Sequence, residues 1–415
     1  MLCSGTLSKT SYFLFACNGA TNQFVAYFSR NYMLNKVLLT LGWICGMQKN
    51  ELTLSGTVVA GDDFEAKDGY VVIENGAIKE IGEGGRKIEA AIEGVIIPAF
   101  VNAHTHIGDS VAKEPDFMPL EKLVGPGGFK HRILAETPYE TLVSAMKDTI
   151  EDMVATGTQM FADFREGGVL GAGALKDALR LSGGNEQLHA KIFGRPADGT
   201  VTDDFNELFE SVDGIGISSV ADNPMEDVKS LAAEAKRRKK MFALHAGEKN
   251  AEDINGAIEL EPDFIVHLLN ASQQDFRTMQ DKNIAAVVCV RSNLVTGLEL
   301  PPLQQMLDAG LIVGAGTDNV MLNSPDMFSE MEFISKIFHL EARAVLKMCT
   351  LNSAQVLKEA ESVGTIEEGK KANLVVIRTD TRNMRNVQNP IKGVVRRATR
   401  NDIAAAIYEG KVVSC

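Results

Sequence analysis

The sequence predicts a (β/α)8 TIM barrel with a small flanking β-sandwich domain that is built from both chain ends. Three observations support this prediction. Eight short apolar segments have the character of strands, amphipathic helical segments separate most of them, and alternating β segments lie at both ends of the chain. Strands that alternate with helices pair in parallel, and eight such units close into a barrel.

The eight predicted strands follow Pro98, where the pattern changes from alternating β segments to apolar strands and helices. The clearest helix covers residues 224–240, where a proline suits the first turn and four apolar residues recur at helical spacing. Residues 98–354 contain all eight units, and their length is close to the roughly 250 residues typical of the fold. The predicted strands are 99–104, 158–164, 190–196, 214–220, 241–246, 264–269, 284–290 and 311–318.

The small β domain is predicted from alternating or apolar segments with glycine turns, which are typical of hairpin-connected strands. These segments are 52–61, 69–82, 364–377 and 403–413. We therefore expect residues 47–97 and 360–415 to form one small domain, and residues 98–359 to form the barrel.

Residues 1–46 differ in composition from the rest of the chain. They hold three of the six cysteines and no acidic residue, whereas the remaining chain is strongly acidic. Our interpretation is an extra N-terminal segment from a misplaced start codon, with the protein beginning at Met47. A targeting peptide is less favoured, because Asn18, Asn22 and Gln23 interrupt the apolar run. Residues 37–47 are too short to span a bilayer, and we assign no function to the segment.

The composition is that of an ordinary globular protein of 415 residues, of which 45% are hydrophobic and 23% are charged. The formal net charge is -13, so neither nucleic acid nor a membrane is expected as a partner, because either would need a basic face. The six cysteines lie far apart and form no CxxC pair, which indicates neither a disulfide framework nor a structural zinc knuckle. We expect a reducing, cytoplasmic setting.

Polar residues at the carboxyl ends of the predicted strands indicate a metal site, because active sites of these barrels lie at that end. His104 and His106 close the first strand, and alternate residues of a strand face the same side. Alone, such a pair is more typical of hydrogen-bonded structural residues. Here His245 closes the fifth strand, His267 the sixth and Asp318 the eighth. Three imidazoles and a carboxylate suit one divalent metal, Zn²⁺ above all, with an open position for water.

Glu248 follows His245 by three residues in the sequence HAGE, which places a carboxylate beside the predicted metal site. Such a carboxylate can take a proton from the attacking water and pass it to a ring nitrogen or a leaving amine. The alternative is a surface acid in the loop after the strand. Asp318 is a candidate for a second role as a proton acceptor, besides its role as a metal ligand.

Five charged residues that follow predicted strands are candidates for substrate contacts: Asp163, Arg165, Glu166, Arg195 and Arg291. The planar guanidinium group suits a carboxylate or a phosphate on the substrate. Salt bridges to Asp163 or Glu166 that hold loops in place are an equally open alternative. The Gly-rich residues 123–132 are a candidate lid between the first strand and its helix. The chain has no P-loop and no GxGxxG, so no nucleotide cofactor is expected.

Four motifs, taken in strand order, resemble those of the amidohydrolase superfamily and, within it, the metal-dependent deaminases of aminated heterocycles. They are PAFVNAHTH (98–106), HAGE (245–248), the single His267 and GTDN (316–319), and the resemblance extends from about residue 48 to residue 415.

This resemblance implies a role for each residue of the predicted site. It implies that His104, His106, His245 and Asp318 bind one metal, usually zinc. It also implies that Glu248 shuttles protons, and that His267 orients the water or stabilises the tetrahedral intermediate. Binuclear relatives carry a lysine at the end of the fourth strand, which this sequence lacks, so the resemblance implies a mononuclear site.

The sequence thus predicts a metal-dependent hydrolase of C–N bonds that deaminates a purine-, pterin- or pyrimidine-type heterocycle and releases ammonia. The expected partners are this small-molecule substrate and water. One alternative is hydrolysis of a cyclic amide or a ring halide on the same scaffold, and another is a non-catalytic scaffold. The sequence does not determine the specific substrate, the metal that is loaded or the oligomeric state. A homo-oligomer is one of the open alternatives.

Overall fold

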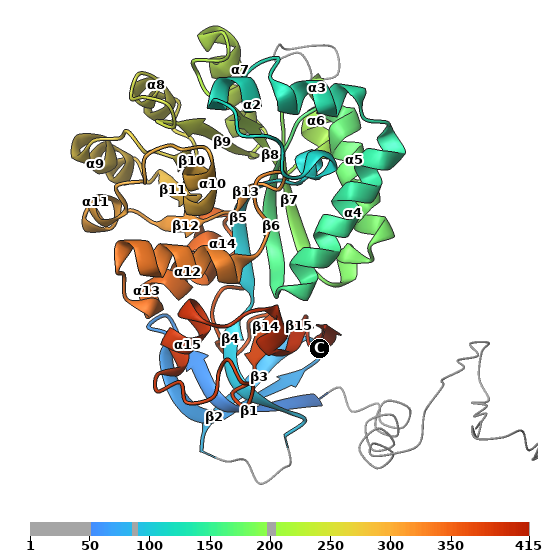
Figure 1. Ribbon diagram of the computed structural model, residues 1–415, viewed down its shortest axis with the longest axis vertical. Helices are drawn as coiled ribbons and strands as arrows, with labels where there is room; N and C mark the ends of the chain where they lie inside the picture. The colour runs from blue at the N-terminus through green and yellow to red at the C-terminus, as the bar shows by residue number, and fades with distance from the viewer. Residues whose placement is uncertain (1–50, 85–89, 197–204, 415) are drawn as a thin grey trace, which may run out of the picture. The chain divides into compact units, whose positions relative to one another are not determined.

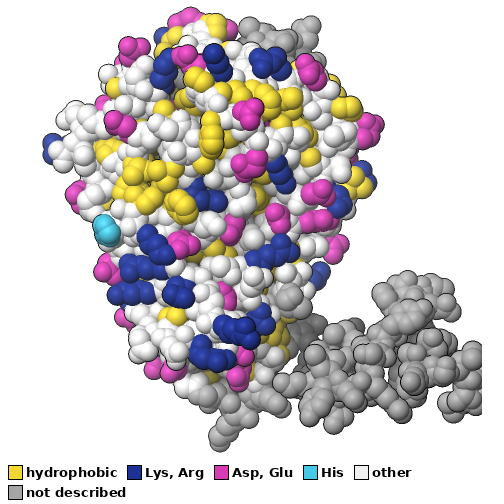
Figure 2. Space-filling model, in the orientation of Figure 1, with side chains coloured by type: hydrophobic (Ala, Val, Ile, Leu, Met, Phe, Trp, Pro, Cys, Tyr) yellow, Lys and Arg dark blue, Asp and Glu magenta, His cyan; other side chains and the backbone are white. Residues whose placement is uncertain are grey.

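The computed structural model describes residues 51–84, 90–196 and 205–414 (Figure 1). The interpretation of residues 1–46 as an extra segment lies outside the described residues. Within the described ranges, no helix is long and apolar enough to cross a membrane. Figure 2 shows charged side chains of both signs spread over the face seen in the orientation of Figure 1. The expected cytoplasmic setting and the expected absence of a nucleic-acid partner stay predictions.

Parallel strands of the middle of the chain curl into a TIM-like barrel. They are β5 (Phe100–His106), β6 (Thr158–Arg165), β7 (His189–Gly194), β8 (Gly214–Ile217), β9 (Met241–Ala246), β10 (Phe264–His267), β11 (Ala285–Val288), β12 (Val313–Ala315) and β13 (Asp318–Asn319). They pair in the order β12-β11-β10-β9-β8-β7-β6-β5-β13. All eight predicted strands are present, and the eighth is divided into β12, which pairs with β11, and β13, which pairs with β5. Because both pieces belong to one short segment, this segment links the two edges of the sheet.

The break in the eighth strand contains Gly316, which lies against the first strand. A Cβ atom at this position would come within 2.7 Å of the backbone oxygen of His104 and within 2.8 Å of its Cβ. A residue without a side chain is therefore required for the two backbones to approach this closely. Their close approach brings Asp318 beside the histidines of β5.

Helices follow the barrel strands and surround them (Figure 1). The helix predicted over 224–240 is observed as α7 (Met225–Arg237), directly after Pro224, and it ends before Lys239, whose φ of 55° is not helical. The other α-helices are α2 (Leu120–Leu123), α3 (Phe129–Glu136), α4 (Tyr139–Ala155), α5 (Gly168–Leu181), α6 (Phe205–Ser211), α8 (Ile254–Glu259), α9 (Gln273–Asp281), α10 (Val290–Val295), α11 (Leu303–Asp308), α12 (Met327–Phe338), α13 (Ala342–Lys347), α14 (Ser353–Val356) and α15 (Pro390–Arg396). Shorter helical turns are η1 (Ile107–Ala112), η2 (Gly184–Glu186), η3 (Met348–Asn352) and η4 (Arg400–Asp402).

Both ends of the described chain meet in a second, seven-stranded sheet. Its strands are β1 (Glu51–Ala60), β2 (Glu65–Glu74), β3 (Ala77–Glu83), β4 (Ile92–Pro98), β14 (Leu374–Ile377), β15 (Ile403–Tyr408) and β16 (Lys411–Ser414). Hydrogen bonds join them in the single order β16-β15-β14-β4-β1-β2-β3. The flanking domain therefore draws on both ends, as predicted, but the predicted sandwich of two sheets is not confirmed. Only Ala99 separates β4 from β5, so this sheet leads directly into the barrel.

Apolar side chains fill the inside of the barrel below its carboxyl end. Val101, Met160, Phe164, Phe193 and Phe264 belong to one buried cluster contributed by neighbouring strands. Because this interior is closed to water, the ends of the strands are the place where the barrel can present polar groups to a ligand.

Candidate active site

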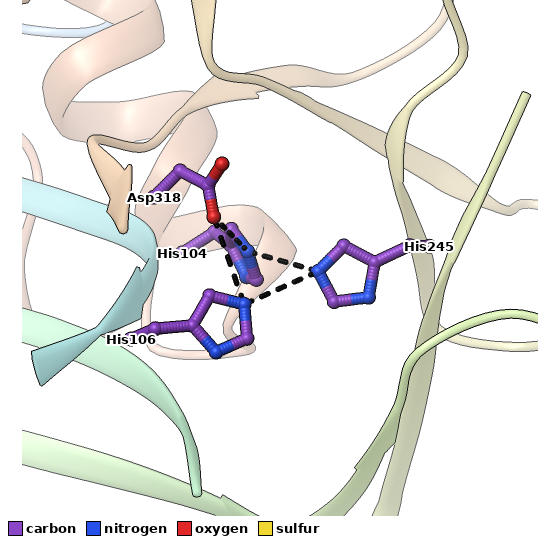
Figure 3. A group of neighbouring side chains, drawn as sticks. All are labelled: His104, His106, His245 and Asp318. Atoms are coloured by element: carbon purple, nitrogen blue, oxygen red, sulfur yellow. Dashed lines mark hydrogen bonds and ion pairs between the residues drawn. The ribbon is translucent and has the colours of Figure 1, made fainter. Parts of the chain in front are cut away.

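Three histidines and one aspartate converge at the carboxyl end of the barrel (Figure 3). His104 and His106 lie two residues apart on β5, so both face the barrel mouth, and β9 and β13 add His245 and Asp318. One donor atom from each residue lies within 4.8 Å of the other three. The arrangement brings together the four residues that the sequence predicts as metal ligands.

The distances between these atoms suit a single small cation. The Nε2 atom of His245 lies 3.1 Å from that of His104 and 3.4 Å from that of His106. The Oδ1 atom of Asp318 lies 3.3 Å from the Nε2 atom of His104 and 3.6 Å from the Nε2 atom of His106. Ligands that bind a tetrahedral zinc ion at about 2.0–2.1 Å lie about 3.3 Å apart, so the donor set fits one such ion.

Backbone carbonyls fix the orientation of two of the imidazoles. The Nδ1 atom of His106 lies 3.1 Å from the oxygen of Phe164, and that of His245 lies 2.9 Å from the oxygen of Ile217. Since a carbonyl only accepts, Nδ1 carries the proton and Nε2 directs its lone pair toward the centre. Burial lowers the pKa of His106 to about 3 and also lowers that of His245. Both rings are therefore neutral near pH 7, which is the form that binds a metal.

Glu248 and His267 lie side by side next to this cluster. The Oε1 atom of Glu248 is 3.6 Å from the Nε2 atom of His267. Burial raises the pKa of Glu248 to about 8, and its side chain is 22% exposed. A carboxyl group that titrates near neutral pH and still reaches a cavity can both accept and donate a proton in one reaction.

A cavity of about 680 Å³ opens over the histidines and the aspartate. His106, His245 and Asp318 line it together with Glu248 and His267. Among its described lining residues no phenylalanine, tyrosine or tryptophan occurs, and charged side chains are frequent. The cavity therefore suits a small polar molecule that approaches the predicted metal ligands and Glu248 at the same time.

The structure brings two of the five predicted substrate-binding residues, Glu166 and Arg195, to this cavity. Arg195 is half-buried, and its guanidinium group makes no hydrogen bond or ion pair with any described residue. Glu166 instead pairs with Lys130 at 2.7 Å and with the Nδ1 atom of His106 at 3.2 Å. Glu166 thus supports a predicted metal ligand, whereas the guanidinium donors of Arg195 have no partner among the described residues.

Asp163, Arg165 and Arg291 do not line the cavity, in contrast to the predicted substrate contact. Arg165 is buried and pairs with Asp163 at 3.4 Å and with Glu166 at 2.6 Å, which corresponds to the salt-bridge alternative. The carboxylate of Asp163 accepts a hydrogen bond of 2.6 Å from the backbone of Ile107, directly after the β5 histidines. Arg291 pairs with Glu330 at 2.7 Å. All three charged groups are occupied by protein partners, so they hold the end of the barrel together.

Several residues at the site were not predicted from the sequence. Lys130 is buried, and its Nζ atom lies 3.2 Å from the Oδ1 atom of Asn319, besides its contact with Glu166. Its only sequence signal is its place in the segment after the first strand, on the catalytic side. Ser292 and Asn293 contact Asp318 and His267, and their only signal is their place shortly after the seventh predicted strand, on the catalytic side.

Comparison with known proteins agrees with this geometry. The model of the amidohydrolase family matches residues 95–413, which is most of the chain. The chain belongs to the amidohydrolase family. The family and its aminohydrolase- and deaminase-named members make it a hydrolase that acts on C–N bonds. The recognition of the family from the four sequence motifs is confirmed.

Three curated relatives illustrate the range of similarity. A protein of Methanocaldococcus jannaschii is 35% identical over 373 residues, which cover 85% of this chain and 96% of the relative. A protein of Methanothermobacter thermautotrophicus, named as an aminohydrolase, is 31% identical and covers 86% and 98% of the two chains. The 5-methylthioadenosine/S-adenosylhomocysteine deaminase of Acetivibrio thermocellus is 26% identical, with 86% and 90% covered.

Solved structures share the fold at low sequence identity. The atrazine chlorohydrolase of Arthrobacter aurescens, in complex with zinc, has a TM-score of 0.74 at 16% identity and covers 88% of this chain and 95% of its own. An adenosine deaminase of Xanthomonas campestris with bound zinc has a TM-score of 0.70 at 16% identity, with 87% and 92% covered. Because these two proteins differ in the reaction that their names describe, this likeness supports the barrel and leaves the substrate open.

Proposed function

We propose that this protein is a mononuclear, metal-dependent aminohydrolase that converts the amino group of a heterocycle into a carbonyl and releases ammonia. The observation that carries the proposal is the position of Glu248 and His267 beside the His104, His106, His245 and Asp318 cluster, at one cavity. Glu248 and His267 suit proton transfer. The three histidines and the aspartate of the cluster suit one divalent cation, for which Zn²⁺ is the preferred candidate.

The residues of the chain divide the work of this reaction. A bound divalent cation would hold the attacking water and lower its pKa. Glu248 takes one proton from the water and delivers it to the ring nitrogen next to the amidine carbon. His267 donates a hydrogen bond to the oxygen that adds to this carbon. The carbon–nitrogen bond of the amino group then breaks, and ammonia leaves with the second proton of the water.

Arg195 defines the expected substituent on the heterocycle. Its half-buried guanidinium group lines the cavity without a described protein partner, and such a group suits a carboxylate or a phosphate. The name of the Acetivibrio relative offers two test compounds, because S-adenosylhomocysteine carries a carboxylate, next to an ammonium group, that 5-methylthioadenosine lacks. A preference for the member of such a pair that carries a carboxylate or a phosphate follows from this role of Arg195.

The test is ammonia release by the zinc-loaded protein across a panel of aminated purines, nucleosides, nucleotides, pterins, cytosines and triazines. Glu248→Gln serves as the blank. Release above this blank supports the proposal, and comparison within pairs shows whether an anionic substituent matters. Silence across the panel with one metal bound per chain favours hydrolysis of a ring amide or a ring halide. Silence without metal binding after zinc incubation favours the non-catalytic scaffold.

A further inference from the structure

The start of α10, the helix that follows β11, lies between His267 and Asp318. In the barrel, β11 pairs with β10 on one side and with β12 on the other. The strand β10 ends at His267, and β13 begins at Asp318 shortly after β12. Side chains at the carboxyl end of β11 can therefore reach sideways to both residues.

Ser292 contacts the aspartate of the metal cluster. Its hydroxyl group donates a hydrogen bond of 2.5 Å to the Oδ2 atom of Asp318. The other carboxylate oxygen, Oδ1, is the atom that faces His104 and His106 at 3.3 and 3.6 Å. The two oxygens of Asp318 thus have separate partners, because Oδ1 faces the β5 histidines and accepts a hydrogen bond of 3.0 Å from the amide of Asn319, whereas Oδ2 accepts from Ser292.

Asn293 contacts the neighbouring histidine. Its Nδ2 atom lies 3.3 Å from the Nδ1 atom of His267, and both residues are buried. An amide nitrogen can only donate, so Nδ1 of the ring accepts and the ring proton is on Nε2. This Nε2 atom is the one that lies 3.6 Å from Glu248 at the cavity.

A buried carboxylate clamps the first turn of α10, the helix that carries these two side chains. Glu330 of α12 accepts hydrogen bonds of 2.7 and 3.3 Å from the backbone N–H groups of Val290 and Arg291, and it pairs with the side chain of Arg291 at 2.7 Å. Arg291 also donates to the backbone oxygens of Ser324 and Asp326. The start of α10 is therefore fixed from two directions.

The residues that Ser292 and Asn293 contact have unusual backbones. His267 has a φ of 75° and Asp318 a φ of 59°, in the left-handed region that side chains rarely adopt. Such conformations persist only where surrounding contacts hold them, and they are concentrated at functional sites. The hydrogen bonds from the clamped turn are contacts of this kind.

We propose that Ser292 and Asn293 are positioning residues for the reaction. Ser292 holds Asp318 with Oδ1 toward the β5 histidines, where this oxygen would contribute to a metal site, and Asn293 holds the ring of His267 with its Nε2–H toward the cavity. The second role rests on the proposed deamination, whereas the first requires only that a metal binds. Neither residue touches the substrate itself.

Zinc affinity tests the role of Ser292 without any substrate. The full chain is titrated with zinc alone against a chromophoric chelator. Loss of a residue that orients a metal ligand typically weakens metal binding about 10- to 100-fold, and we expect this range for Ser292→Ala. Ser292→Thr keeps the hydroxyl group and should restore most of the affinity. Affinity of Ser292→Ala equal to that of the wild type overturns this role.

A matched control separates positioning from general loss of stability. The hydroxyl group of Ser353 is also buried, and it accepts a hydrogen bond of 3.1 Å from the backbone of Ala315 in β12. Ser353→Ala should lower the melting temperature and leave the zinc affinity unchanged. An equal loss of zinc affinity in both alanine variants would show that Ser292 acts only through stability.

The ring protonation of His267 tests the role of Asn293. In ¹⁵N-histidine-labelled protein, the wild type should show His267 as the Nε2–H tautomer, assigned by comparison with His267→Asn. Asn293→Asp puts a carboxylate oxygen opposite Nδ1, so the ring should gain an Nδ1 proton and kcat should fall with little change in KM. Unchanged ¹⁵N signals of His267 in Asn293→Asp overturn this role. If the signals change but no panel compound releases ammonia, the positioning is upheld and the proposed deamination fails.

Discussion

The mouth of the barrel and the seven-stranded sheet bury opposite kinds of side chain. At the mouth, His104, Asp163 and Arg165 are among many buried charged or polar groups, each 1% exposed or less. In the sheet, the buried cluster is apolar and includes Leu54 and Ile96. Burying charged groups costs free energy that their pairing largely offsets, so the paired groups at the mouth hold their neighbours in place but stabilise the fold less than an apolar core of the same size would. The difference indicates that the sheet serves stability and the mouth serves chemistry.

The largest effect is expected from removing a metal ligand. In His245→Ala the three remaining donors should no longer hold a zinc ion tightly, and ammonia release should fall to the level of the blank. The fold should persist, because the apolar interior below the ligands is unchanged. Metal analysis and circular dichroism check both parts. A variant that keeps one tightly bound zinc and full activity would contradict the conclusion that the mouth of the barrel serves the chemistry.

Glu248→Gln distinguishes two roles of residues at the mouth, because it removes proton transfer and leaves the predicted metal ligands intact. We expect turnover to fall about 10²- to 10⁴-fold, since this is the usual contribution of a general acid–base. The zinc content should stay at the wild-type value. Glu259→Gln, at an exposed position of α8, is the matched control and should be indistinguishable from the wild type. Near-normal turnover of Glu248→Gln contradicts its assignment as the proton carrier.

Lys130→Met tests whether the charges around the metal ligands matter for the reaction. The ammonium group connects Glu166, which contacts His106, with Asn319, which follows Asp318. We expect kcat to fall about 10- to 100-fold, in line with other residues that support metal ligands. Lys191→Met is the control, because Lys191 pairs with Glu359 near the start of β7. Equal kinetics in the two variants would show that the charge of Lys130 does not contribute to the reaction.

Stability as a function of pH offers a smaller effect at the mouth. Burial raises the pKa of Glu248 to about 8, whereas an unfolded glutamate titrates near about 4.3. The folded metal-free protein therefore holds this proton where the unfolded chain has lost it, so the free energy of unfolding falls between these pH values. Glu248→Gln should reduce the fall by at most several kcal/mol, at about 1.4 kcal/mol per pKa unit. Thermal unfolding across this pH range checks the prediction, and identical curves contradict it.

The smallest effect on activity is expected from the seven-stranded sheet. Ile96 on β4 is fully buried, so Ile96→Ala should lower the free energy of unfolding by about 2–5 kcal/mol. Zinc affinity and kcat at a permissive temperature should stay unchanged. Denaturant unfolding together with the kinetic assay checks this. A large loss of kcat in the folded variant would show that the sheet takes part in the chemistry.

The strands and the convergence of the four candidate ligands could be predicted because both follow from local pattern. Apolar segments of strand length identify the barrel strands, and the fold places the last polar residue of each strand at the mouth. His104, His245 and Asp318 are found in this way. The arrangement of the small sheet is different, because alternation predicts strands but not which strands pair. The sequence pattern therefore did not determine whether these strands form one sheet or a sandwich of two.

The supporting residues of the site depend on contacts between distant parts of the chain. Lys130 and Asn319 are 189 positions apart, and Ser292 and Asp318 are 26 apart. No spacing rule links such pairs. For Arg165 and Arg291, the direction of the side chain decides between a substrate and a salt bridge, and the sequence alone does not determine that direction. The structure shows both arginines paired with carboxylates.

The most direct test of the deaminase account follows the atoms of one turnover. The zinc-loaded protein is given its best panel compound in H₂¹⁸O, ammonia is counted, and the product is analysed by mass spectrometry. The account predicts one ammonia for each product molecule, one ¹⁸O in a new ring carbonyl and an intact ring. Two outcomes would contradict deamination. One is a ring-opened product that has gained water without release of ammonia, and the other is a product that has lost halide instead.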